Sequence, residues 1–291
     1  MRNYIVIFII LFITKSSVKS QDDWDFESNK LYNKIFLDTR AINGHTVNTL
    51  NKKEFELRIS HRFGDIATSQ SYRSLFGLDY STDIRIGFEY GITEKLMLGF
   101  GRCKGSSPFL ELWDLFFKRN LYSSSDKKFK TTIDTKLFFT SMQSSFDLTS
   151  PNYFSKFSHR LSYHSEILFA YRFHKKLIIQ LGPGISYRNL VNNEDDNLLF
   201  NISSVVKLHL YKKLSLMIEH FSILSSNEYR ISNYKNPLGI GLEINTYAHV
   251  FQLNFMNSKG IGEGQFIPYT SSNWKLGEFR FGFTIARKFN T

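Results

Sequence analysis

The sequence lacks the features of several common protein classes. With one cysteine, Cys103, in 291 residues, it can form no internal disulfide and no metal site built from several thiolates. It has no apolar run of roughly 20 residues, the length that a transmembrane helix needs, so a bundle of membrane helices is excluded. Its 5 prolines are scattered, and no proline- and serine-rich linker divides the chain. We expect Cys103 to be a small structural residue near a strand end.

The chain is instead rich in aromatic residues, although its mean hydropathy is low. It contains 29 phenylalanines and 15 tyrosines, and its mean hydropathy is −0.25. A membrane β-barrel reconciles the two values, because an apolar, aromatic outer face alternates along each strand with a polar inner face. The formal net charge is +11. Because the lysines form no dense run, we expect contact with anionic lipid headgroups and no nucleic-acid partner.

The N-terminus resembles a cleaved secretory signal peptide. A basic residue precedes a short apolar run over residues 4–13, and small residues lie just before a cleavage site at Gln21. The apolar run is too short to span a bilayer as a helix, although an uncleaved anchor is an alternative. We predict three regions: a signal peptide at 1–20, a periplasmic N-terminal segment or lumen plug at 21–52, and a transmembrane β-barrel at 53–291.

The rest of the chain alternates between apolar and polar residues with a period of two, which indicates half-buried strands. Near the C-terminus, for example, Phe279, Phe281, Phe283 and Ile285 share one face, and charged or small residues occupy the other. The pattern predicts an all-β fold, a closed antiparallel transmembrane β-barrel of twelve strands, with ten or fourteen as alternatives. The predicted strands cover residues 53–63, 80–91, 95–102, 109–118, 130–142, 160–173, 176–188, 197–211, 213–224, 237–246, 248–257 and 277–289.

The lengths of the predicted connections give the barrel an orientation. If the first strand runs outward, four of the five connections on the periplasmic side are tight, and the connections on the opposite side include five long ones, at 64–79, 143–159, 189–196, 225–236 and 258–276, as in bacterial outer-membrane barrels. The C-terminus then lies in the periplasm. Aromatic residues near the strand ends fit the interfacial girdles of such barrels; they are Phe63, Tyr90, Tyr171, Phe173, Tyr187 and Phe289.

Several strings of the sequence resemble a known family. They are TRAINGHTV (39–47), ELRISHRFGD (56–65), LFGLD (75–79), GITEKLMLGFGR (91–102), HVFQLNFMNSKG (249–260) and RFGFTIARKF (280–289). These strings are similar to those of an uncharacterised family of Bacteroidota outer-membrane β-barrels, domain of unknown function 5777. The resemblance implies an outer-membrane barrel and brings no established activity. Its most specific strings single out Arg40, Asn43, Gly44, His45, Ser60, His61, Arg62, Phe63 and Gly64 as family-motif candidates.

Extending the alternation along each strand predicts which charged side chains face the lumen. The candidates are Glu54, Glu56, Arg58, Arg62, Asp83, Arg85, Glu89, Asp134, Lys136, Glu166, Arg172, Arg188, Lys207, Glu219, Glu243 and Arg280. With Glu278 and Lys288 added, acids and bases balance, whereas a strongly selective pore usually shows a ring of one sign. The balance favours a structural network of salt bridges in a narrow lumen, and a wet channel for small solutes is the alternative.

Three pairs of inward-facing glycines add to this interpretation. They are Gly99 with Gly101, Gly182 with Gly184, and Gly239 with Gly241. Glycine inside a strand marks a bend or the close approach of another group. The pairs therefore indicate either barrel curvature or an N-terminal segment folded into the lumen as a plug.

No motif predicts catalysis, a cofactor or a metal centre. His164 and Glu166 share an inward face, but two ligands do not make a metal site, and an ion pair is the favoured interpretation. For His61 we favour an interfacial structural role. His220 and Ser222 both point outward, an arrangement similar to that in outer-membrane phospholipase A, where a serine attacks lipid with histidine as base. The match stops at these two residues, so a lipid hydrolase is a remote alternative.

The predicted function is that of an outer-membrane barrel of a Gram-negative bacterium, either a passive channel or a binding protein for a small solute. The alternative is a structural or partner-binding barrel with a closed, salt-bridged lumen. We expect the chain to contact outer-membrane lipid and, through its C-terminal strand, the barrel-assembly machinery.

Overall fold

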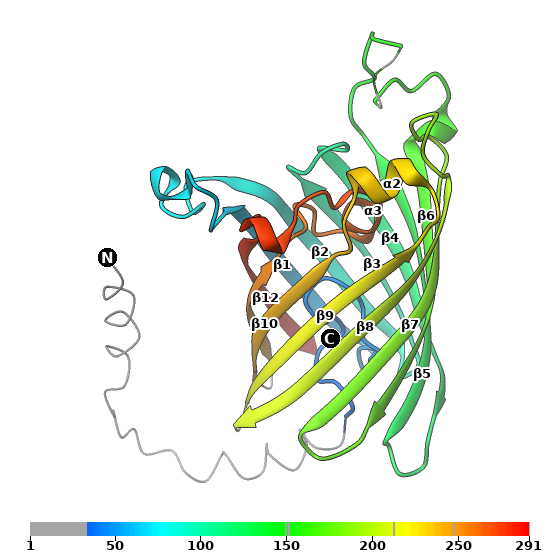
Figure 1. The fold of residues 1–291 in the computed structure, drawn as a ribbon. Coiled ribbons are helices and arrows are strands. Elements are labelled where there is room, and N and C mark those ends of the chain that lie inside the picture. The colour runs from blue at the N-terminus through cyan, green and yellow to red at the C-terminus, as the bar shows by residue number, and fades with distance from the viewer. Residues whose placement is uncertain (1–33, 149, 151, 212, 247, 291) are drawn as a thin grey trace, which may run out of the picture.

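The structure is a closed barrel of twelve antiparallel strands, as the alternation predicted (Figure 1). This computed structural model describes residues 34–290 apart from residues 149, 151, 212 and 247, so the predicted signal peptide and residues 21–33 lie outside the described residues. Each strand pairs with its neighbours in sequence, and β1 pairs with β12 to close the barrel. The strands are β1 (Glu54–Asp65), β2 (Ser81–Thr93), β3 (Leu96–Lys104), β4 (Glu111–Ser123), β5 (Phe129–Thr140), β6 (Leu161–Arg172), β7 (Leu177–Arg188), β8 (Leu198–Tyr211), β9 (Leu214–Leu224), β10 (Leu238–Asn245), β11 (His249–Met256) and β12 (Arg280–Asn290).

Burial alternates along the strands, because successive side chains of a strand point to opposite faces of the sheet. In β1, for example, Glu56 and Arg58 are buried on the inside, whereas Ile59 on the outside is 38% exposed. The outer face is a belt of exposed Phe, Leu, Ile and Tyr side chains. The interior is polar, the reverse of a soluble protein and the arrangement that a membrane barrel requires.

Most strand boundaries lie within one or two residues of the predicted ones, and two differ by three residues or more. β4 continues to Ser123, beyond the predicted end, so the one periplasmic connection that was predicted to be long is a short turn between Ser123 and Phe129. β12 begins at Arg280, three residues late, because the 3-10 helix η4 (Trp274–Leu276) ends at Gly277 in the left-handed conformation with a φ of 75°.

The two ends of the barrel differ, and the short turns mark the periplasmic end in barrels of this kind. The long connections at the opposite, outer end carry η2 (Ser71–Ser74), η3 (Phe157–Arg160), α2 (Glu228–Asn233), α3 (Glu263–Tyr269) and η4. Among the described residues, no helix is long and apolar enough to cross a membrane. The loop that carries α3 folds inward, and Glu263 to Pro268 are buried.

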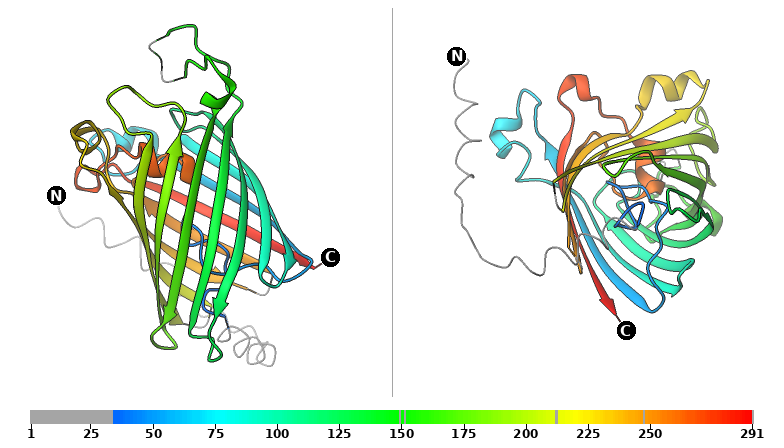
Figure 2. Two further views of the ribbon diagram at one scale, coloured as in Figure 1. Left: turned by 90° about the vertical axis from the view of Figure 1, so that its right-hand side faces the viewer. Right: turned by 90° about the horizontal axis from the view of Figure 1, so that it is seen from below.

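Residues 34–52, here called the luminal segment, lie inside the barrel (Figure 2). Residues 38–50 are all buried. The segment enters at the periplasmic end, turns inside the barrel and returns to the start of β1. Its placement makes the interior of the barrel the candidate site.

Candidate functional site

The luminal segment forms a short hairpin inside the barrel. An antiparallel bridge joins Arg40 to His45. At the turn between them, the backbone N–H of Ala41 donates to the carbonyl of Gly44 at 2.8 Å. Residues 39–46 are here called the luminal hairpin.

Glu219 of β9 holds the tip of the luminal hairpin. The backbone N–H groups of Ile42, Asn43 and Gly44 donate to its carboxylate at 2.8, 3.1 and 3.2 Å. Converging backbone N–H groups of this kind form an anion-binding nest. The salt bridges of the described residues do not include Glu219, so the hairpin tip supplies the partners that its buried carboxylate requires.

Apolar contacts hold the luminal segment inside the barrel at two places, near the periplasmic end and at the hairpin tip. Near the periplasmic end, Phe36 and Val47 belong to a buried cluster with side chains of β6, β7 and β8. At the tip, Ile42 packs among Met217, Phe221, Met256, Phe266 and Ile267. An added Cβ at the predicted inward Gly239 would lie 3.1 Å from Ile42 Cδ1, so that glycine makes room for the tip.

A buried ion pair anchors the base of the hairpin. The guanidinium of Arg58 on β1 donates to both carboxylate oxygens of Asp38, and it also contacts Glu56 at 2.7 Å. Burial alone would raise the pKa of Asp38, but the charge of Arg58 outweighs burial and holds that pKa below its ordinary value. Asp38 therefore stays ionised at neutral pH and binds Arg58 as a carboxylate.

A second ion-pair group links the hairpin to the outer loop. Arg40 lies 3.2 Å from Glu89 of β2 and 3.4 Å from Glu263, the first residue of α3. Lys136 of β5 contacts the same Glu263 oxygen at 2.5 Å. Burial would raise the pKa of Glu263, but Lys136 and Arg40 lower it to about 2. One carboxylate thus joins the luminal hairpin, α3 and the barrel wall.

Arg62 of β1 also bridges the hairpin and the outer loop. It donates to the side-chain oxygen of Asn43 at 2.9 Å and to the carbonyl of Ser258 at 3.1 Å. The segment that enters from the periplasmic end and the loop that enters from the outer end therefore meet inside the barrel. Together they occupy its interior.

His45 is buried at the foot of the hairpin. Its ring packs edge-on against Phe116 of β4, with the centroids 4.6 Å apart, and its Nδ1 lies 3.3 Å from Asp134. Burial, together with the positive charges of Arg40 and Lys136, holds the pKa of His45 well below 6.5. The imidazole is therefore neutral at pH 7.

Glu278 and Lys288, which were added to balance the predicted charges, are half-buried, and of the sixteen listed lumen-facing candidates the structure buries all but one. Arg172 is the exception: it is half-buried at the periplasmic end, where it donates to the carbonyl of Lys34. Some predicted residues pair with each other, as Lys207 does with Glu243 and Lys136 with Asp134. Buried charges number twelve carboxylates and ten Arg or Lys side chains among the described residues, so the interior is close to neutral.

The prediction missed four charged residues of the interior: Asp38, Asp114, Lys118 and Glu263. Asp114 of β4 forms a two-point ion pair with Arg85, at 2.9 and 2.7 Å, and Lys118 donates to the carbonyl of Thr39 at 2.9 Å. The period-two alternation of β4 places Asp114 and Lys118 on its inner face, but the Leu and Phe residues between them obscure this pattern in the sequence.

The family-motif candidates divide between the lumen and the outer face. Arg40, Asn43, Gly44 and His45 form the hairpin, and Arg62 reaches it from β1. Ser60 also faces inward, where it receives a hydrogen bond from Thr284 at 2.9 Å. His61 and Phe63 lie on the outer side with their rings 4.2 Å apart, and Gly64 hydrogen-bonds Gly77 at 2.9 Å.

The histidines that were considered as possible sites make hydrogen bonds with serines and one long contact with a carboxylate. His164 binds Ser186 at 2.8 Å and lies 3.9 Å from Glu166. Within the described ranges, no group of three or more His, Cys, Asp or Glu side chains is arranged to hold a metal ion. Ser222 lies 3.3 Å from His220 on the outer face. Cys103 is buried.

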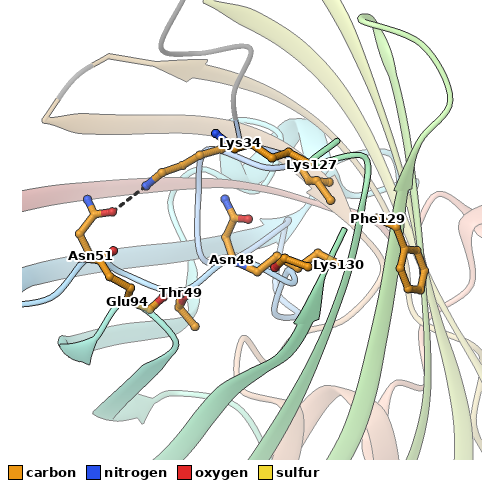
Figure 3. A pocket seen from close by; sticks show the side chains of 10 residues that line it. Lys34, Asn48, Thr49, Asn51, Glu94, Lys127, Phe129 and Lys130 are labelled. Atoms are coloured by element: carbon orange, nitrogen blue, oxygen red, sulfur yellow. Dashed lines mark hydrogen bonds between the residues drawn. The ribbon is translucent and has the colours of Figure 1, made fainter. Parts of the chain in front are cut away.

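A basic cavity of about 260 Å³ lies where the luminal segment enters the barrel. Figure 3 shows Lys34, Lys127 and Lys130 around it, with Glu94 as the acidic residue. Lys34 donates to Asn51 at 3.1 Å, which ties the two ends of the luminal segment together.

Comparisons with known proteins agree with this architecture. A family model described as "Membrane bound beta barrel domain (DUF5777)" matches residues 36–289. The NanC porin is similar in structure, with a TM-score of 0.50 and 9% identity over 81% of this chain and 99% of that one. A KdgM porin in complex with disordered oligogalacturonate has a TM-score of 0.50 and 8% identity over the same shares. No curated protein matched in sequence. These findings are consistent with the predicted location in the outer membrane of a Gram-negative bacterium.

Proposed function

The chain belongs to the family of membrane-bound β-barrel domains known as domain of unknown function 5777, and from this premise we propose that it is a gated conduit for a small solute, closed at rest by its own luminal segment. In the open state the luminal segment leaves the lumen toward the periplasm. The observation that carries the proposal is the nest at the hairpin tip, where Glu219 binds three backbone N–H groups.

The contacts of the hairpin support a removable plug more than a permanent core. Its charged partners, Glu89 and Arg58, belong to the barrel wall and would face the lumen once the hairpin had left. A polar wall of this kind takes up water in place of the hairpin, whereas an apolar wall would resist hydration. Buried ion pairs also contribute less to stability than apolar packing of the same volume, which favours a plug that can leave.

Single-channel conductance in a planar bilayer tests this proposal. We compare the mature chain with a deletion of residues 21–50, which removes the hairpin, and with a matched deletion of residues 21–33, which leaves the luminal segment intact. We expect the larger deletion to give stable conductance steps and the smaller one to stay near the lipid baseline. Closed traces from all three proteins, each folded, would reject the conduit and favour a structural or partner-binding barrel.

We further propose that the chain is not an enzyme. The contact between Ser222 and His220 supports hydrogen bonding on the outer face, and among the described residues no third side chain hydrogen-bonds His220. Hydrolysis by a nucleophilic serine needs a base whose orientation is fixed by a further group. Release of fatty acid from phospholipid vesicles that stops on substitution Ser222→Ala would overturn this proposal.

The proposed surroundings of the barrel follow from its surfaces. The belt of exposed apolar side chains fits outer-membrane lipid. The C-terminal strand β12, which closes the sheet against β1, is the proposed contact with the barrel-assembly machinery. We also propose that the chain comes from a bacterium of the Bacteroidota.

A further inference from the structure

A cavity of about 590 Å³ opens at the outer end of the barrel. Five outer loops line it, namely the connections β3–β4, β5–β6, β7–β8, β9–β10 and β11–β12. Figure 1 shows α2 and α3 at this end of the barrel. The volume falls in the range of roughly 300–1,000 Å³ that is typical of sites for small ligands.

Aromatic rings from different loops form one wall of this cavity. Tyr229 and Tyr234 have ring centroids 6.2 Å apart, Tyr234 and Tyr269 are also 6.2 Å apart, and Tyr269 lies 5.9 Å from Phe109. All three contacts are edge-to-face. The three tyrosines and Tyr153, which also lines the cavity, are half-buried, so part of each ring is open to a ligand.

A buried ion-pair group holds this wall in place. Asp195 contacts Arg188 at 3.0 Å and Arg230 at 2.7 Å. The Arg188 guanidinium lies 5.2 Å from the Tyr269 ring, and that of Arg230 lies 4.7 Å from the Tyr234 ring. Cation–π contacts of this kind orient the rings before a ligand arrives, which lowers the entropy cost of binding.

The opposite wall and the rim are polar, and they carry few charged side chains. Asn192 and Asn193 are exposed there, beside several serines. The one acid of the lining, Asp195, is already paired with Arg188 and Arg230, and the one lysine of the lining, Lys259, is exposed. The cavity thus offers aromatic faces and neutral hydrogen-bonding groups, with a single exposed cation, Lys259, in its lining.

We infer that this outer cavity is a binding site for a neutral saccharide. A sugar ring presents C–H bonds on its faces, and these meet the negative face of an aromatic ring, while its hydroxyls project sideways toward polar groups. A purely apolar ligand would make no use of the polar groups of the rim, and an anionic ligand would find one lysine in the lining, Lys259, rather than a cluster of basic side chains. The inference goes beyond the proposed function and does not depend on it, because binding at the outer mouth needs no open lumen.

Calorimetric titration of the folded, full-length mature chain in detergent tests the inference. The probes are maltotriose, cellotriose and mannotriose, with trigalacturonic acid as the acidic counterpart. We expect at least one neutral trisaccharide to bind, and Tyr234→Ala to weaken that binding by about tenfold, the usual effect of removing an aromatic anchor. Tyr234→Phe should retain the affinity, because it preserves the ring.

Two further variants keep the test decisive. Tyr72→Ala is the matched control, because Tyr72 is 62% exposed in another outer loop and does not line the cavity; it should leave binding unchanged. If Tyr234→Ala does not fold, Asn193→Ala, at an exposed rim position, should weaken binding several-fold. Absence of binding by all neutral probes, preference for trigalacturonic acid, or equal affinity of the cavity variants and Tyr72→Ala would overturn the inference.

Discussion

The carboxylate of Glu219 accepts a hydrogen bond from the backbone N–H of Gly44, 3.2 Å away, at the tip of a hairpin that the barrel encloses. The contact joins a strand of the wall to the luminal segment without an intervening basic side chain. A backbone N–H group is a donor regardless of the side chain that its residue carries. This attachment therefore depends on the backbone conformation of the hairpin and on the charge of Glu219.

Substitution Glu219→Gln should therefore loosen the hairpin. A neutral amide offers one acceptor oxygen to the three N–H groups, and its NH₂ group repels the rest. Leaving buried donors unsatisfied costs about 1–3 kcal/mol. We expect hydrogen exchange of Ile42, Asn43 and Gly44 to speed up by at least about tenfold, as measured by mass spectrometry of the folded barrel.

Glu166→Gln is the matched control for this prediction. Glu166 is also a buried luminal carboxylate, but it binds Ser203 of the wall at 2.9 Å. Exchange in the hairpin should stay unchanged in this variant. Equal exchange at the hairpin tip in the wild type and in Glu219→Gln would mean that the nest does not hold the segment.

Much of this arrangement is predictable from the sequence. Features that depend on neighbouring residues of one strand can be predicted, whereas those that depend on contacts between residues far apart in sequence cannot. Alternation along β1 places Glu56, Arg58 and Arg62 inside, because side-chain direction in a strand follows from the backbone alone. The same rule is obscured in β4, where Phe116 faces inward to pack on His45. An apolar residue at an inward position makes sense only when the luminal hairpin is known.

The hairpin itself has no periodic pattern from which its position could be predicted. Its conformation depends on groups distant in sequence, such as Glu219 and Glu263, which lie 175 or more positions from Gly44 and Arg40. The resemblance of the string around Asn43 to a family motif marked the right residues without indicating their partners. The ligand-sized outer cavity was missed for the same reason, since five loops build it.

The docking of α3 should depend on pH through Glu263. Its pKa is lowered from 4.5 to about 2 in the folded chain, so its ionised form stabilises the folded state. This contribution, about 3 kcal/mol, is fully present above pH 4.5 and is lost as the pH falls toward 2. A nitroxide label at Ser271→Cys, in a Cys103→Ser background, should gain mobility over that range.

Glu263→Gln separates this effect from general acid unfolding. The variant should show a mobile label already at pH 7 and little further change down to pH 3. Circular dichroism at each pH reports whether the barrel stays folded. An identical pH profile in the parent and in the variant would place the acid transition elsewhere.

Gly99→Ala should destabilise the barrel. An added Cβ would lie 2.3 Å from the ring of Phe116, which is held between the wall and His45, and 3.0 Å from the carbonyl of Phe88. Forcing a methyl group into such a site costs about 1–3 kcal/mol. The free energy of unfolding in urea measures the loss. Gly262→Ala, whose Cβ would approach only Cys103 as closely as 3.1 Å, should cost less, and the reverse order would contradict this account.

The ion pair between Arg85 and Asp114 provides a test of how the lumen is stabilised. Both side chains are buried, and their two-point contact at 2.9 and 2.7 Å satisfies both carboxylate oxygens. Removing one partner leaves an uncompensated buried charge, so Arg85→Met and Asp114→Leu should each lower the free energy of unfolding by about 3–5 kcal/mol.

The double variant should recover most of that loss, because two apolar side chains leave no charge unpaired. Urea unfolding of the four proteins measures the coupling, and Glu111→Gln, which breaks the exposed contact with Lys104, should leave stability unchanged. Additive losses in the double variant would show that Arg85 and Asp114 act independently, and that the internal charges stabilise the barrel through separate contacts with the wall.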